Sequence, residues 1–242
     1  MTATHISARE LLARSESDAR ERVRSGKPAL VSPPPFFDSA KDEATVYVYD
    51  AIGGWFGIDP KVWVPEFSGI LASTIHIRIN SPGGAIFDAE AMRTAVKQHK
   101  AKVIAHVDGY AASAATCVAI AADEVEISEG AWWMIHDAWG ALSGEAKDMR
   151  AYADMLEKAN ESLVTSYCKK TGKSEKQIRD WMASETWFTA PEALAHRFVD
   201  RIFKIDVDGQ SKVSAQASVR TDVNMTQRAR VLMLAGLGGF HG

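Results

Sequence analysis

The chain has 242 residues, of which 46% are hydrophobic and 24% are charged, the balance of an ordinary globular protein. Its formal net charge of −3 gives no sign of a nucleic-acid partner, and no apolar run approaches the roughly 18 residues of a membrane span, so neither kind of partner is expected. The two cysteines have no metal-ligand spacing and the N-terminus has no secretory signal. We therefore expect a cytoplasmic protein without a disulfide framework or zinc site.

Three segments differ in composition along the chain. Residues 1–37 are predicted to be an appended arm, with a weak amphipathic helix over 6–24 and three successive prolines that favour an extended linker. Residues 38–207 are predicted to form the folded domain, and residues 208–242 a loosely held tail. The arm is interpreted as a solvated extension, with a targeting segment or a propeptide as the alternatives.

Between the arm and the tail, strand-like and helix-like segments alternate. Runs of β-branched or alternating apolar residues predict strands, and apolar residues at helical spacing predict helices. In chain order the expected elements are strand 44–50, helix 60–71, strand 73–80, helix 85–100, strand 102–109, helix 113–123, strands 124–128 and 131–139, a helical region over 143–184 that stops at Gly172 and resumes after Ser174, a helix begun at Pro191, and strand 201–207. This alternation predicts an α/β fold with a mostly parallel sheet that is buried on both faces.

Three features of the sequence fit nucleophilic catalysis. The segment INSPGG (79–84) leads a strand into a Pro-Gly-Gly turn before a helix, where a backbone amide is able to donate to an oxyanion. Ser113 follows a strand and begins an alanine-rich helix, so the next amide, that of Ala114, points at the same place. His136 ends an apolar strand and is the residue type that accepts a serine proton near neutral pH.

Each of these features also has a purely structural interpretation. Most Pro-Gly-Gly turns only reverse the chain. Small residues around Ser113 let a helix approach its neighbours closely, and a lone histidine is often a hydrogen-bonded core or edge residue. Taken singly, none of the three features decides between packing and catalysis.

Taken together, in order and spacing, they resemble the ClpP-type serine peptidases. The resemblance extends over residues 44–205 and includes INSPGG, GYAASAA (109–115), MIH (134–136), the long helical region and FTAPEALAHRFVD (188–200). The segments DAIGGWFG (50–57) and ETWFTAPEA (185–193) are most similar to the branch found in bacteriophages, the prohead or head-maturation proteases. The resemblance implies a ClpP/crotonase-like spiral of βαβ units with a helical handle at about 143–184.

The resemblance also implies roles for individual residues. Ser113 takes the place of the nucleophile and His136 that of the general base, and the amides of Gly84 and Ala114 stand where the family forms its oxyanion hole. The handle implies homo-oligomeric rings that enclose the active sites and stack face to face.

The third member of the triad departs from the family pattern. The position expected to hold the acid is Thr186, and the adjacent Glu185 is able to orient His136 after a shift of one residue. We expect Glu185 as the acid, with Thr186 or a dyad-like arrangement as the alternative. Asp180 and Asp137 are weaker candidates.

The predicted activity is that of a serine endopeptidase that hydrolyses peptide bonds through an acyl-enzyme, with no metal and no other cofactor. The chain lacks a GxxxxGK[ST] phosphate loop, so any ATP-driven unfolding is expected to come from a separate partner. The expected substrates are proteins or peptides, including phage scaffold and capsid proteins in the host cytoplasm or the prohead. The alternatives are a catalytically weakened ClpP-like ring protein with a scaffolding role, or a crotonase-like acyl-CoA enzyme.

Overall fold

A computed structural model of the chain describes residues 41–53 and 57–204, the backbone of residues 36–38, and positions 7, 10, 13, 14, 17 and 21 of the arm. The chain divides into two compact units, residues 1–205 and 206–242. The predicted tail and almost all of the predicted arm, with its helix over 6–24, lie outside the described residues, so both stay predictions.

The described elements alternate between strands and helices as the sequence predicts. They are β1 (Phe36–Asp38), β2 (Glu43–Val48), α2 (Pro60–Ser68), β3 (Thr74–Ser81), α3 (Ile86–Gln98), β4 (Lys102–Ala112), α4 (Ala114–Ala119), β5 (Glu124–Ser128), β6 (Trp132–Ile135), α5 (Ala146–Thr171), α6 (Glu175–Ala183), β7 (Thr186–Thr189), α7 (Ala190–Ala195) and β8 (Arg201–Phe203).

A single sheet of the described strands has the order β1-β2-β3-β4-β5-β8, with β6 added beside β4 and β7 beside β6. Only the β1–β2 and β6–β7 pairs are antiparallel, so the predicted mostly parallel α/β sheet is confirmed. β4 changes partner along its length: residues 104–107 pair with β5, and residues 110–112 pair with β6. The end of β4 is thereby brought beside β6.

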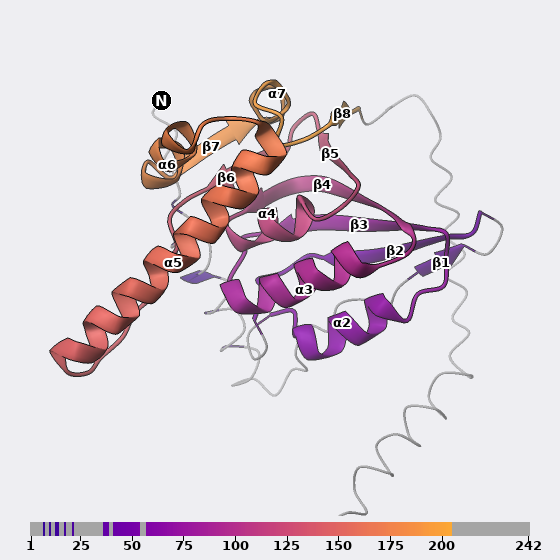
Figure 1. Cartoon of the computed structure of the whole chain (residues 1–242). Coiled ribbons are helices and arrows are strands. Elements are labelled where there is room, and N and C mark those ends of the chain that lie inside the picture. The colour runs from indigo at the N-terminus through magenta and orange to yellow at the C-terminus, as the bar shows by residue number, and fades with distance from the viewer. Residues whose placement is uncertain are drawn as a thin grey trace, which may run out of the picture. The chain divides into compact units, whose positions relative to one another are not determined.

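One face of the sheet forms the core against α2, α3 and α4, which lie together in front of it in Figure 1. The alternating isoleucines of β3, Ile75, Ile77 and Ile79, all point to this face and are fully buried. The prediction that both faces are buried is wrong, because the residues between them, such as His76 and Arg78, are polar and partly exposed on the opposite face.

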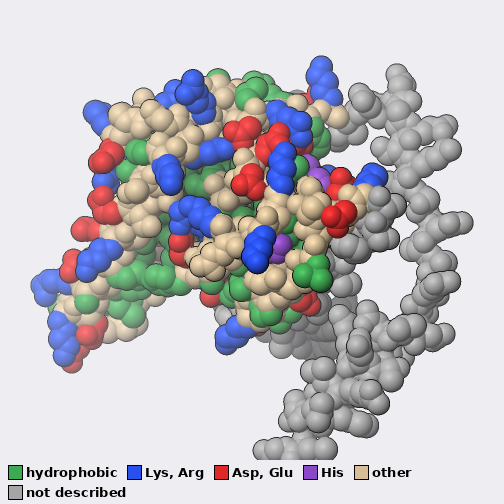
Figure 2. Space-filling view, turned by 45° about the vertical axis from the view of Figure 1, so that its right-hand side comes forward, with side chains coloured by type: hydrophobic (Ala, Val, Ile, Leu, Met, Phe, Trp, Pro, Cys, Tyr) green, Lys and Arg blue, Asp and Glu red, His purple; other side chains and the backbone are tan. Residues whose placement is uncertain are grey.

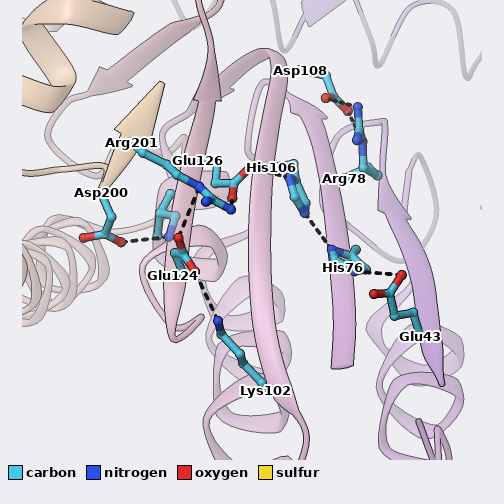
Figure 3. A network of polar contacts seen from close by, with 11 residues as sticks. Glu43, His76, Arg78, Lys102, His106, Asp108, Glu124, Glu126, Asp200 and Arg201 are labelled. Atoms are coloured by element: carbon cyan, nitrogen blue, oxygen red, sulfur yellow. Dashed lines mark hydrogen bonds and ion pairs between the residues drawn. The ribbon is translucent and has the colours of Figure 1, made fainter. Parts of the chain in front are cut away.

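That opposite face carries a row of ionisable side chains, which we call the polar ladder: Glu43, His76, His106, Glu126 and Arg201 (Figure 3). His76 Nδ1 lies 2.8 Å from His106 Nε2, and His106 Nδ1 lies 3.1 Å from a Glu126 carboxylate oxygen. A carboxylate only accepts, so His106 donates from Nδ1 and accepts from His76 at Nε2. Burial, with added repulsion from Arg78 and His76, lowers the pKa of His106 to about 3, so the ring stays neutral near pH 7.

The predicted helical region over 143–184 is two helices separated at Gly172. A capping box between Glu145 and Asp148 begins α5, and Gly172 ends it in the left-handed conformation, with φ 71°. The Ser174 hydroxyl accepts from the Gln177 amide and begins α6, as predicted. The first half of α5 extends past the sheet in Figure 1 and is largely exposed, whereas its second half packs into the core.

Three local predictions differ from the structure around the end of β4. β4 continues to Ala112 because β6 gives it a second parallel partner, and α4 ends at Ala119 instead of 123. Residues 186–189, expected to lead directly into a helix, form β7. They form a strand because they pair with β6, and local sequence propensity does not predict a contact with a distant strand.

Basic and acidic side chains are interspersed over the face shown in Figure 2, in keeping with the small net charge of −3. Among the described helices, none is both long and apolar enough to cross a membrane.

Candidate active site

Ser113 lies at the sharp turn between β4 and α4, which we call the nucleophile turn (residues 112–114). Its backbone has φ 53° and ψ −128°, a conformation that a non-glycine residue adopts only at a cost of about 1–3 kcal/mol. The surrounding structure holds it there, since the Ser113 amide donates to the Met134 carbonyl at 2.9 Å. The turn carries the hydroxyl out of the strand and directs it at the end of β6.

His136 follows directly after β6 and faces Ser113. Because Ala112 pairs with Met134 in the parallel β4–β6 ladder, the residues after both strands emerge side by side at the same sheet edge. His136 Nε2 lies 2.7 Å from Ser113 Oγ, and the ring is only 8% exposed. A hydroxyl at this distance is in position to pass its proton to the imidazole.

On the other side of the ring, Glu185 and not Thr186 faces His136. A Glu185 carboxylate oxygen lies 3.7 Å from His136 Nδ1, in ion-pair range but longer than a hydrogen bond. Thr186 is paired with Ile135 in the β6–β7 ladder, and its hydroxyl donates to the Trp181 carbonyl at 2.7 Å. The β7 register therefore turns Thr186 away, and Glu185 reaches the ring from a backbone with φ 46°.

The two weaker candidates for the acid are placed elsewhere. Asp180 lies on α6, where its carboxylate pairs with the Lys176 ammonium at 2.7 Å. The Asp137 side chain is exposed to solvent. Of the four candidates, Glu185 is the one whose carboxylate the structure brings to His136 within ion-pair distance.

The Pro-Gly-Gly turn lies against the nucleophile turn. A Cβ at Gly83, where φ is +85°, would lie 2.6 Å from the Ala112 carbonyl oxygen and 2.7 Å from the Ala114 amide nitrogen. At Gly84 a Cβ would lie 2.0 Å from the Ile52 carbonyl oxygen. Only glycine fits at either position, and this lets the two turns touch.

The amides of Gly84 and Ala114 are not used by the backbone hydrogen bonds of the two turns, so each is able to donate. The bridge between Ile52 and Gly84 uses the Gly83 carbonyl and the Ala85 amide, so it does not use the amide of Gly84 itself. Ala114 is the first residue of α4, and the first amides of a helix have no acceptor within that helix. Both residues line the cavity described next.

A cavity of about 350 Å³ opens beside Ser113 and His136. Its other wall comes from α5, with Tyr152, Met155 and Leu156 among the lining side chains. The sequence reasoning missed these residues, although their helical spacing already placed them on one face of a helix. Only the fold shows that this face lines the same cavity as a serine some forty residues earlier in the chain.

Within residues 41–53 and 57–204, no group of three or more His, Cys, Asp or Glu side chains is arranged to hold a metal ion. The expectation that the chemistry needs neither a metal nor another cofactor stays a prediction.

The chain is similar to known Clp proteases in sequence and in fold. A family model described as Clp protease matches residues 71–206. The chain is 28% identical over 167 residues to ATP-dependent Clp protease proteolytic subunit 1 of Protochlamydia amoebophila, covering 66% of this chain and 81% of that protein. It is 31% identical over 134 residues to the ATP-dependent Clp protease proteolytic subunit of Streptococcus pyogenes, covering 54% and 68%.

Among solved structures, a mutant of ClpP1 from Listeria monocytogenes matches with a TM-score of 0.60 and 22% sequence identity, over 67% of this chain and 92% of that one. At this identity the likeness is one of fold. It confirms the predicted ClpP-like architecture.

Proposed function

Because the chain belongs to the Clp protease family, we propose that it is a serine endopeptidase that hydrolyses peptide bonds through an acyl-enzyme. One observation carries the proposal: Ser113 Oγ lies 2.7 Å from His136 Nε2, at a strained turn that opens onto a cavity. A hydroxyl is a weak nucleophile until a base accepts its proton, and the short distance supports His136 as that base.

In the acylation step, His136 accepts the Ser113 proton as Oγ forms a bond to the carbonyl carbon of the substrate. The carbonyl oxygen takes up the negative charge, and the Gly84 and Ala114 amides donate to it. Collapse of this intermediate breaks the C–N bond, and His136 returns the proton to the leaving amine. The acyl group is then held as an ester on Ser113.

Water completes the reaction by the same route in reverse. His136 accepts a proton from water as the water oxygen attacks the ester carbonyl, and it then protonates Ser113 Oγ as the acid product leaves. In both steps His136 becomes positively charged. The Glu185 carboxylate beside Nδ1 stabilises that charge and favours the ring orientation in which Nε2 faces Ser113.

We propose further that the protein works as a homo-oligomeric ring whose contacts include the exposed first half of α5. That segment leaves the body of the domain in Figure 1, and it presents Met149, a large apolar side chain that is half exposed. Light scattering of the purified full chain tests this, and a monomer at micromolar concentration contradicts it.

For substrates we propose the scaffold and capsid proteins of a bacteriophage head, cut in the host cytoplasm or in the prohead. The support is the resemblance of DAIGGWFG and ETWFTAPEA to that branch. Coexpression of the active chain with the neighbouring structural proteins should yield cut products that Ser113→Ala does not give. Structural proteins that emerge uncut, with cleavage only of unrelated host proteins, would refute this assignment.

The catalytic assignment is tested by labelling with a fluorophosphonate probe, which reacts with activated serines. Wild type should be labelled, and both Ser113→Ala and His136→Ala should lose the label. Ser162→Ala, which removes an exposed serine on α5, and His99→Ala, beyond the end of α3, are the matched controls and should label like wild type. An assembled wild-type oligomer that does not react favours the scaffolding alternative.

A further inference from the structure

A row of hydrogen-bonded side chains connects α5 to the nucleophile turn. Thr116 lies in the first turn of α4, Tyr167 lies on the buried half of α5, and both are buried. Thr116 Oγ1 is 2.6 Å from the carbonyl oxygen of Ser113 and 2.6 Å from the hydroxyl oxygen of Tyr167.

The direction of each hydrogen bond follows from the chemistry of the groups. The Ser113 carbonyl only accepts, so Thr116 gives it the one proton of its hydroxyl. Tyr167 must then donate to Thr116. The Thr116 hydroxyl therefore donates once and accepts once, an arrangement in which neighbouring bonds strengthen one another in a buried setting.

The row ends at the group that fixes the orientation of Ser113. The Ser113 carbonyl also accepts from the Thr116 amide at 3.0 Å, so two donors of one residue hold it. Its direction sets the ψ angle of −128° at Ser113, a backbone conformation that does not persist without support. If the carbonyl swings, Oγ moves with the backbone and loses its alignment with His136.

We propose that Thr116 and Tyr167 are positioning residues, which hold the nucleophile turn so that Ser113 Oγ stays within hydrogen-bond distance of His136. This rests on the proposed function. Because Tyr167 belongs to α5, which also lines the cavity, the same row makes the reactivity of Ser113 depend on the position of α5. Thr116 and Tyr167 do not touch the reacting atoms themselves.

The test removes one hydroxyl at a time and keeps the shape of the side chain. Thr116→Val and Tyr167→Phe should each lower kcat for a fluorogenic peptide about tenfold and leave KM within about twofold, since a misplaced nucleophile affects the chemical step more than substrate binding. The double variant should lose little more than either single one, because the row is already broken. Thr116→Ser keeps the hydroxyl and should restore most of the rate.

Thr171→Val is the matched control. Thr171 is a buried threonine of the same helix, and its hydroxyl donates to the Tyr167 carbonyl at 2.7 Å without contact with the nucleophile turn. This variant should melt at a lower temperature than wild type and keep the wild-type kcat. The proposal is overturned if folded, assembled Thr116→Val and Tyr167→Phe keep the wild-type kcat, or if Thr171→Val loses as much as they do.

Failure of the proposed function gives a different result. If wild type is not labelled by the fluorophosphonate probe, the peptidase assignment fails. The positioning claim is then decided by a crystal structure of Thr116→Val. A Ser113 that keeps its φ and ψ angles and its distance to His136 in that structure overturns the claim, and a relaxed backbone supports it.

Discussion

Glu185→Gln removes the negative charge beside His136 and keeps the length and shape of the side chain. The carboxylate oxygen is 3.7 Å from Nδ1 of His136. At this distance, Coulomb's law gives an attraction for the protonated ring of about 1 kcal/mol in water and about 4.5 kcal/mol at the effective dielectric constant of about 20 that fits protein sites. These limits correspond to a loss of rate between about fivefold and about two thousandfold.

The exposure of Glu185 decides where between these limits the effect should lie. Its side chain is 25% exposed while that of His136 is 8% exposed, so the pair is partly screened by water. We expect kcat/KM for a fluorogenic peptide to fall about a hundredfold in Glu185→Gln, with slower fluorophosphonate labelling and an unchanged oligomer.

Thr186→Val and Asp137→Asn are the controls for this prediction. The Thr186 hydroxyl is bonded to the Trp181 carbonyl and the Asp137 side chain points to solvent, so both variants should keep kcat/KM within about threefold of wild type. The reasoning is refuted if Glu185→Gln stays within that range, or if Thr186→Val is the variant that loses the activity.

Three further changes have definite expected results. Gly83→Ala places a Cβ within 2.7 Å of the nucleophile turn and should abolish fluorophosphonate labelling. The control Gly130→Ala, whose Cβ meets nothing within 4 Å, should label normally, and equal labelling of the two variants would contradict the contact between the turns. Leu156→Trp fills part of the 350 Å³ cavity and should raise KM for peptides with large apolar residues at the cleaved bond, while a small fluorophosphonate still reacts. An unchanged KM would show that the substrate does not bind in this cavity. Burial lowers the pKa of His106 to about 3, so as the pH falls from 7 to 5 the unfolded chain binds a proton here that the folded chain does not. This group should therefore lower the free energy of unfolding by about 2 kcal/mol over that range. Urea titrations at the two pH values should show this loss reduced in His106→Gln but not in His99→Gln, and an equal loss in both variants would show that His106 is not its source.

Several parts of the fold were predictable because their causes are local. The alternation of Ile75, Ile77 and Ile79 predicts a strand with one buried face, and Gly172 and Ser174 carry the residue types that end one helix and begin the next. The polar side chains on the opposite face of the sheet were not predicted, although His76 and Arg78 are the residues between those isoleucines. Whether a polar residue on a parallel strand faces water or a charged partner depends on neighbouring strands far away in the sequence.

The sequence singled out Ser113 and His136 as a pair through the order and spacing of motifs that resemble the ClpP-type peptidases. Each residue follows a strand, and parallel strands in one sheet present their ends at a common edge, which is the physical reason that the structure brings the two side chains together. The sequence favoured Glu185 over Thr186 only as the adjacent carboxylate, and the tertiary structure decides which of the two faces His136. That outcome depends on the register of β7 against β6, which pairs Thr186 with Ile135 and leaves the preceding residue to turn toward the imidazole. Because side chains alternate along a strand, a shift of one residue in that register would exchange the directions of Glu185 and Thr186. The pairing joins distant segments, so neither segment by itself predicts the register.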